Sequence, residues 1–267
     1  MQREADVCIW HRGLIARWWA EFLHGGSEVD YLRRWIDRYG QPVLDAGCGA
    51  GRLLVPYLRA GLDVDGSDVS ADMLAHCAEQ ARRDGFEPRL YEQPLHALDL
   101  PRRYRSICVC GVFGLGVSRA QDREALRRLL HHLEPGGAVL LNHYVSWLDA
   151  PLWQYWQPER RARLPEPMPE PTEARLTSDG SALRLRSRVL EFDPNGPSVV
   201  REVLTESLRD GAVEREERSQ VRENLYFPNE IALLLEQTGF RNVVVHTDHP
   251  ASGFAPAGNV FTIVAER

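Results

Sequence analysis

The 267-residue sequence contains no lysine, because all 32 of its basic residues are arginine. Mechanisms that need an ε-amine are therefore excluded, among them Schiff-base chemistry, pyridoxal phosphate anchoring and the lysine of a phosphate-binding P-loop. No apolar stretch approaches the roughly 18 residues of a membrane span. The net charge of −6 provides no positive field for nucleic acid or an anionic membrane. We expect a soluble globular protein with neither of these partners.

Cysteine is also scarce, and its five residues are an odd number. The N-terminus lacks the basic-then-apolar pattern of a secretion signal, so we expect a reducing, cytoplasmic location. Cys108 and Cys110 would share one face of a strand, and no second CxC or CxxC motif accompanies them. Buried thiols are therefore expected rather than a metal site. The histidines lack companions at ligand spacing, so no metal is predicted. They are His131, His132, His246 and His249.

Apolar periodicity divides the first 150 residues into alternating helices and strands. Two amphipathic helices are predicted, over residues 9–23 and 32–39. Predicted strands follow at 42–45, 62–67, 89–92, 104–111 and 138–142, with helices near 51–60, 70–84 and 119–133 between them. Such alternation predicts a parallel sheet covered by helices on both faces.

The composition changes at residue 150, where five prolines fall between residues 158 and 171. This density favours an extended connection or lid over helix or central strand. Segments 183–192, 199–209 and 213–222 then alternate apolar with charged residues, which predicts an antiparallel meander with one wet face. A last helix at 228–238 and strands at 243–247 and 260–265 return to the first pattern. We therefore expect a helical cap (1–40), a core (41–149), a lid (150–225) and the end of the core (226–267).

A glycine-rich turn is the motif that carries chemistry. Gly47, Gly49 and Gly51 lie between the first core strand and a helix, where the backbone can approach a ligand and helix N–H groups are free. Asp68 ends the next strand, 21 residues after Gly47, and a carboxylate there can accept both ribose hydroxyl protons. A nucleotide-type cofactor is expected. The dinucleotide pattern GxGxxG/A is disfavoured, because Arg52 stands at its sixth position.

The pattern D-x-G-x-G-x-G, with an acid after the second strand, resembles class I S-adenosylmethionine-dependent methyltransferases. Residues 68–74 (DVSADML) look like the family's D-x-S-x-x-M-L stretch, and residues 133–137 (LEPGG) match its L-x-P-G-G turn. Glu92, Gln93 and Pro94 lie where a residue after the third strand contacts adenine in that family. The family often has Asp there. Together these motifs cover roughly residues 40 to 145 in the family's order.

The resemblance implies a Rossmann-like, doubly wound, mostly parallel sheet with an antiparallel last strand. It also implies an inserted antiparallel β-layer, similar to the lid of small-molecule N- and O-methyltransferases. S-adenosylmethionine would be the cofactor and S-adenosylhomocysteine the product. The expected cofactor-binding residues are Asp45, Gly47, Gly49, Gly51, Asp68, Val69, Gln93, Pro94 and Phe113.

Methyl transfer from a sulfonium is an in-line displacement, so proximity and an apolar site matter most, and a base helps only if the nucleophile carries a proton. His143, just beyond the fifth strand, is the predicted general base, and a purely hydrogen-bonding role stays open. Phe113, after the fourth strand, either packs beside the methyl donor or belongs to the core.

Substrate contacts are expected from the first helix and from the region after the fifth strand. His11 and Arg17 would close over the cofactor or bind a substrate carboxylate, or else lie on a solvated helix face. Tyr144, Trp147 and Trp153 would line an aromatic acceptor pocket or anchor the lid.

The sequence thus predicts a methyltransferase acting on an N or O nucleophile of a small molecule, such as a specialised metabolite, as a monomer or homodimer. An alternative is an S-adenosylmethionine-binding protein that transfers no methyl group and serves as scaffold, regulator or catalyst of another reaction. A peptide, protein or nucleic-acid methyltransferase is less favoured, because the chain is acidic and its expected lid is rich in tryptophan.

Overall fold

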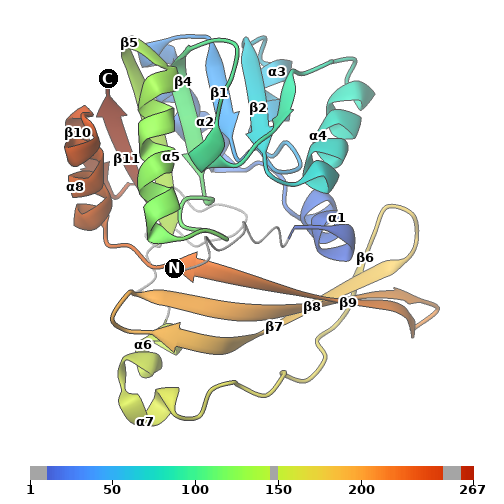
Figure 1. Ribbon diagram of the computed structural model, residues 1–267. Helices are drawn as coiled ribbons and strands as arrows, with labels where there is room; N and C mark the ends of the chain where they lie inside the picture. Colours follow the sequence, from blue (N-terminus) through green and yellow to red (C-terminus); the bar gives the residue numbers. More distant parts are fainter. Residues whose placement is uncertain (1–10, 145–149, 249–259) are drawn as a thin grey trace.

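The computed structural model describes residues 11–144, 150–248 and 260–267. In these residues a seven-stranded sheet carries helices on both faces, and a four-stranded antiparallel sheet lies beneath one edge of it (Figure 1). The seven-stranded sheet and its helices are called the core here. The four-stranded sheet is called the lid sheet.

The core sheet has the strand order β10-β11-β5-β4-β1-β2-β3. Its strands are β1 (Val43–Ala46), β2 (Val64–Asp68), β3 (Leu90–Glu92), β4 (Tyr104–Cys110), β5 (Leu133–Tyr144), β10 (Arg241–His246) and β11 (Val260–Glu266). Strands β1 to β5 pair in parallel, whereas β11 is antiparallel to both β5 and β10. The predicted fold class, including the antiparallel last strand, is confirmed.

Alternating residues of the strands bury into two apolar clusters, one on each face of the core sheet. Ile107 and Val109 of β4 join the cluster under α5 and α8, whereas Cys108 and Cys110 join the cluster under α2, α3 and α4. Both cysteines are buried free thiols, as predicted. The helices are α1 (Gly13–Phe22), α2 (Ser27–Tyr39), α3 (Leu54–Arg59), α4 (Ala71–Arg83), the 3-10 helix η1 (Leu95–Ala97), α5 (Arg119–His132) and α8 (Pro228–Thr238).

Two helix starts are set by local side chains. The hydroxyl of Ser70 accepts the Met73 N–H at the start of α4, and Ser118 forms a capping box with Gln121 at the start of α5. These caps place the first turns of both helices at the edge where the parallel strands end. The site described below is at that edge.

The lid sheet contains β6 (Arg175–Leu176), β7 (Ala182–Asp193), β8 (Ser198–Arg209) and β9 (Ala212–Asn224), in that order. The predicted meander is present, but its outer face is not fully exposed to solvent. Glu206 is buried and paired with Arg184 and Arg186, and Glu202 is paired with Arg188. The long arginine side chains cover the carboxylates there.

The proline-rich connection is only partly extended. It begins with α6 (Ala150–Trp153), the 3-10 helix η3 (Gln154–Trp156) and α7 (Pro158–Arg161). The prediction of extended chain from residue 158 was wrong at its start. Pro158 occupies the first turn of α7, where no backbone N–H is needed, so proline is compatible with helix there.

The lid sheet is tied to the core through β9. The N–H of Asn224 donates to the Gly114 carbonyl, and the N–H of Gly116 donates to the Arg222 carbonyl, both at 2.8 Å. The buried carboxylate of Asp122 in α5 also accepts the Asn224 amide and the Tyr226 hydroxyl, each at 2.7 Å. The loop after β4 therefore fixes one end of the lid sheet against the core.

Candidate active site

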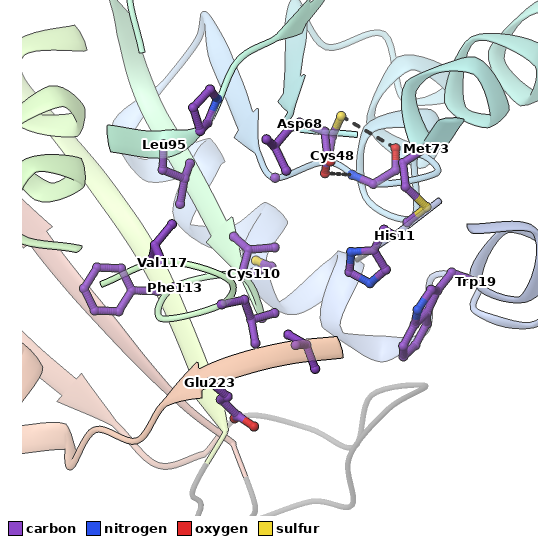
Figure 2. A pocket seen from close by; sticks show the side chains of 18 of the residues that line it. His11, Trp19, Cys48, Asp68, Met73, Leu95, Cys110, Phe113, Val117 and Glu223 are labelled. Atoms are coloured by element: carbon purple, nitrogen blue, oxygen red, sulfur yellow. Dashed lines mark hydrogen bonds between the residues drawn. The ribbon is translucent and has the colours of Figure 1, made fainter. Parts of the chain in front are cut away.

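A cavity of about 670 Å³ lies between the carboxyl edge of the core sheet and the inner face of the lid sheet. Figure 2 shows Asp68 and Met73 on the core side and Glu223 on the lid strand, with Phe113 and His11 on opposite flanks. Its volume is in the range of small-molecule and cofactor sites, roughly 300–1,000 Å³. Open α/β sheets bind ligands at this edge.

The glycine turn forms part of the cavity wall. Gly47 has φ of +81°, and a Cβ there would come within 2.6 Å of Val112. Gly47 and Gly49 line the cavity, and their contact with a cofactor stays a prediction. Gly51 does not line the cavity, so its cofactor role also stays a prediction. Its φ is +92°, and a Cβ at this position would lie 2.9 Å from the Cys77 sulfur, so glycine is needed there for packing against α4.

Asp68 ends β2 at the cavity, next to Val69, which also lines it. Its two carboxylate oxygens accept the N–H groups of Ser70 and Gly49, each at 2.9 Å. Burial raises the pKa of Asp68, and these backbone hydrogen bonds partly offset that rise. The carboxylate is thus held in one orientation, with lone pairs left for further donors. Its role as ribose acceptor stays a prediction.

Asp45 ends β1 beside the same turn and is only 2% exposed. Its Oδ2 has no hydrogen-bond partner among the described residues. Burial raises the pKa of Asp45 to about 7, and the nearby Arg52 guanidinium offsets part of that effect. A buried acceptor oxygen at a cavity wall fits a cationic ligand group such as an ammonium, because the ligand would supply the missing donor.

Gln93 and Pro94 follow β3 and line the cavity, as does Leu95. The Gln93 side chain is already engaged, since its Oε1 accepts the N–H of Asp99 at 2.8 Å and its Nε2 donates to the Asp99 carbonyl at 3.3 Å. Gln93 therefore shapes this loop. Leu95 and His96 were missed from the sequence, although their position after the third strand was a usable signal.

His143 and Phe113 both line the cavity. His143 is 3% exposed, and its ring lies 6.5 Å from that of Phe113, 6.1 Å from Tyr226 and 5.8 Å from Phe261. Its Nε2 has no partner within the part of the chain that the structure describes. Burial lowers the pKa of His143 to about 4, so the imidazole is neutral near pH 7. It has the protonation state of a base but little driving force to take a proton.

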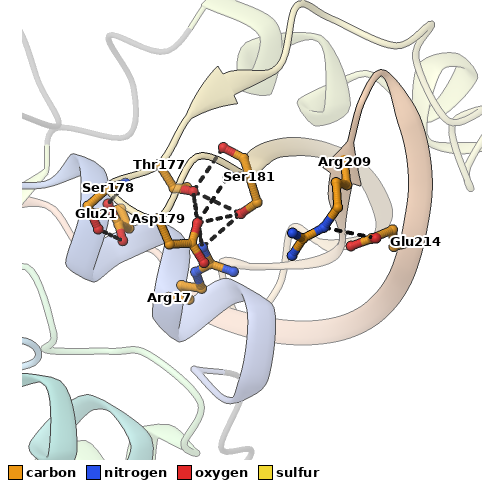
Figure 3. Close-up of polar contacts among 8 residues, drawn as sticks. All are labelled: Arg17, Glu21, Thr177, Ser178, Asp179, Ser181, Arg209 and Glu214. Carbon is orange, nitrogen blue, oxygen red and sulfur yellow. Dashed lines mark hydrogen bonds and ion pairs between the residues drawn. The ribbon is translucent and has the colours of Figure 1, made fainter.

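The N-terminal segment contributes differently from what the sequence suggested, because α1 begins at Gly13 and His11 precedes the helix. His11 lines the cavity, its ring 5.8 Å from that of Trp19, and burial lowers its pKa to about 3. Arg17 does not line the cavity, so its role in substrate binding stays a prediction. Its guanidinium donates to Asp179 at 2.8 Å and to Ser181 at 2.9 Å, on the turn before β7 (Figure 3).

The three aromatic residues that were predicted to contact the substrate differ in their positions. Tyr144 lines the cavity. Trp147 lies outside the described residues. Trp153 is 48% exposed in α6 and does not line the cavity, because α6 and η3 cover the end of the lid sheet. Its substrate contact stays a prediction. Trp19 and Leu23 supply apolar wall that the sequence analysis did not assign.

The lid wall was not anticipated at the level of residues. It consists of alternate positions on three strands, namely Leu185, Ser187, Arg201, Val203, Val221 and Glu223.

No group of three or more metal-ligating side chains occurs among the described residues. Within the same residues, no helix is both long enough and apolar enough to span a membrane.

Residues 43–137 match the protein family described as "Methyltransferase domain". Over these residues the chain is similar to methyltransferase domains, and its motifs resemble those of the class I S-adenosylmethionine-dependent ones. This confirms the resemblance noted in the sequence, and S-adenosylmethionine is the cofactor of this class. The glycine turn, Asp45 and Asp68 all lie within the matched residues.

Two curated relatives each match less than half of the chain. The ribosomal protein L11 methyltransferase of Pseudomonas aeruginosa is 34% identical over 117 residues, covering 42% of this chain and 37% of the relative. The glycine/sarcosine N-methyltransferase of Halorhodospira halochloris is 32% identical over 129 residues, covering 46% of this chain and 48% of the relative. The chain thus spans less than half the length of these two relatives.

Solved structures match nearly the whole chain. An S-adenosylmethionine-dependent methyltransferase from Clostridium acetobutylicum has a TM-score of 0.66 at 16% identity, covering 89% of each chain. A sugar N-methyltransferase from Streptoalloteichus has a TM-score of 0.64 at 19% identity, covering 91% of this chain and 87% of the other. At these identities the likeness shows a shared fold.

Proposed function

We propose that this protein transfers a methyl group from S-adenosylmethionine to a nitrogen or oxygen of a small molecule. One observation carries the proposal: a single cavity joins the glycine turn and Asp68 of the core to the inner face of the lid sheet. Cofactor and acceptor would therefore share one space, which is what direct transfer requires. The sugar and glycine/sarcosine N-methyltransferases among the similar proteins support a small acceptor.

The residues present fit the cofactor. Asp68 would accept the ribose hydroxyl protons, and Gly47 and Gly49 would let the methionine portion approach the backbone. The open oxygen of Asp45 would accept the ammonium group. The loop of Gln93 and Pro94 would face the adenine.

When bound, S-adenosylmethionine supplies an electrophilic methyl group, which a nucleophile takes as the carbon–sulfur bond breaks and its electron pair stays on sulfur. The protein's part is to align the acceptor and to exclude water. Phe113, Val117 and Val203 provide apolar wall for this purpose. His143 would take a proton only from an acceptor that still carries one.

A scaffold or regulator that only binds the cofactor remains the competing function. Calorimetry with S-adenosylhomocysteine tests the shared first step: the proposal expects saturable binding with one site per chain and no comparable heat with NAD. NAD binding without any response to either sulfur nucleotide would refute both functions. Transfer itself is tested by the labelling measurement that closes the Discussion.

A further inference from the structure

The lid wall of the cavity carries charge at two positions. Among the described lid-sheet residues that line it, Arg201 of β8 and Glu223 of β9 are charged, whereas Leu185, Val203 and Val221 are apolar. Both charged side chains are half-buried. Charges on an otherwise apolar, partly enclosed wall interact strongly with ligand groups, because little water screens them.

The strand register places these two side chains near each other. Arg201 pairs with Val221, and Glu223 pairs with Val199, so the two residues are diagonal neighbours on one face of adjacent strands. Diagonal neighbours of this kind have Cβ atoms about 7–8 Å apart. A small molecule can therefore contact both.

Arg201 and Glu223 also differ in how far they lie from the core. Glu223 forms a bridge with Leu115, in the loop that follows β4 on the core side. Arg201 lies one strand further from that loop, between β9 and β7. A molecule that touches both residues would thus have its Glu223 end nearer the core and its Arg201 end further out along the lid sheet.

Taking the proposed methyl transfer as given, we propose that the acceptor carries both an amine and an oxyanion group. Glu223 accepts the amine N–H groups, and Arg201 binds the carboxylate or phosphate with its planar guanidinium. The amine end is the one nearer the core, so nitrogen is the methylated atom. The protein is on this account an N-methyltransferase, and Arg201 and Glu223 determine its specificity.

Methyl transfer to the amine conserves atoms and charge. The acceptor ammonium first loses one proton, which His143 accepts and passes to water, and this frees the nitrogen lone pair. That lone pair forms the new nitrogen–carbon bond while the carbon–sulfur bond breaks and its electrons remain on sulfur. The products are the N-methylated ammonium, S-adenosylhomocysteine and the released proton.

The test uses four probes that share a benzene ring and differ in their charged groups. They are 4-(aminomethyl)benzoate, 4-(aminomethyl)phenylphosphonate, benzylamine and benzoate, and each is added to the full chain saturated with S-adenosylhomocysteine. Calorimetry should show at least one of the two zwitterions binding roughly tenfold or more tighter than benzylamine and benzoate, as expected for one added charge-assisted hydrogen bond. The carboxylate and phosphonate probes show which oxyanion is preferred.

Variants assign the two contacts. Arg201→Met should remove the zwitterion's advantage over benzylamine, and Glu223→Gln should remove its advantage over benzoate. Arg222→Met and Glu216→Gln are matched controls, because both residues are exposed on the outer face of β9. They should leave the affinities unchanged.

Equal affinity for all four probes, binding of none, or equal losses in the control variants would overturn the inference. Binding of S-adenosylhomocysteine is measured in the same experiment. If that binding is absent, the proposed function fails; if it is present and the probes show no charge preference, only this inference fails.

Discussion

The guanidinium of Arg17 in α1 lies 2.8 Å from the carboxylate of Asp179, on the turn between β6 and β7 (Figure 3). The same helix reaches the core, where the N–H of Gly13 donates to Asp72 in α4 at 2.7 Å. Helix α1 therefore bridges the core and the lid sheet, and its Trp19 lines the cavity between them.

Arg17→Met should loosen this bridge and raise the dissociation constant of S-adenosylhomocysteine by up to about fivefold. The modest size follows from the exposure of Asp179, because solvent screens exposed ion pairs. Calorimetry checks the affinity. Arg33→Met is the control, since Arg33 pairs with Asp37 within α2. An equal effect of both substitutions would contradict a bridging role for Arg17.

Asp68→Ala should weaken S-adenosylhomocysteine binding by roughly 100-fold, because two ribose hydroxyls lose a charged acceptor, each contact contributing about 1.5 kcal/mol or more. Thermal unfolding should be followed too, since Asp68 also accepts the N–H groups of Gly49 and Ser70. Asp63→Ala is the control, because Asp63 pairs with Arg89 and Arg102 instead. Unchanged affinity in Asp68→Ala would refute the ribose assignment.

Asp45 should make cofactor binding pH-dependent. With a pKa of about 7 in the free protein, its carboxyl must lose a proton before it can accept an ammonium, so affinity should fall up to tenfold per pH unit below 7. Asp45→Asn should flatten this dependence, as measured by calorimetry between pH 5.5 and 8. A wild-type affinity that does not change over this interval would exclude Asp45 as the ammonium acceptor.

The same carboxyl affects folding stability with the opposite sign. Its folded pKa is raised from 3.8, so between about pH 4 and 7 the folded chain binds a proton that the unfolded chain does not. Protonated Asp45 therefore favours the folded state. In the cofactor-free protein its contribution to the free energy of unfolding should be largest below about pH 4 and should be lost as the pH rises to about 7. Denaturant titrations of the wild type and Asp45→Asn isolate this contribution.

His143→Ala should leave S-adenosylhomocysteine affinity unchanged and lower turnover by roughly 10²-fold, the lower end of the range for a general base. The low end is expected because burial lowers the pKa of His143 to about 4. The wild-type rate profile should accordingly show no histidine inflection between pH 6 and 7, and the loss should shrink at high pH. Full activity in the variant would contradict a general-base role for His143, and catalysis would then depend only on alignment of the acceptor with the methyl group.

The core half of the cavity was predictable because its determinants are local. A strand, a glycine turn and a helix follow one another within residues 43–59, and Asp68 ends the next strand. Parallel strands bring such ends to one edge whatever the rest of the chain does. Gly51 shows the limit of this approach: it packs against α4, and sequence spacing does not distinguish a glycine that faces a ligand from one that faces a helix.

The lid half of the cavity was not predictable, because it depends on contacts between distant segments. Arg17 and Asp179 are 162 residues apart, so no local pattern indicates their pairing. Which of Arg201 and Glu202 faces the cavity depends on the register of β8 against β9, and a slip of one residue would exchange the faces. Trp153 shows the same limit, since aromatic density alone does not say which surface a short helix covers.

The most direct test of the central claim is transfer of a labelled methyl group. The protein is incubated with methyl-labelled S-adenosylmethionine and a metabolite extract that has been separated from macromolecules, with Asp68→Ala as control. We predict label in a new small molecule, formed by the wild type and strongly reduced in the variant. Label confined to added protein or RNA, or saturable cofactor binding with no transfer to any compound, would contradict it.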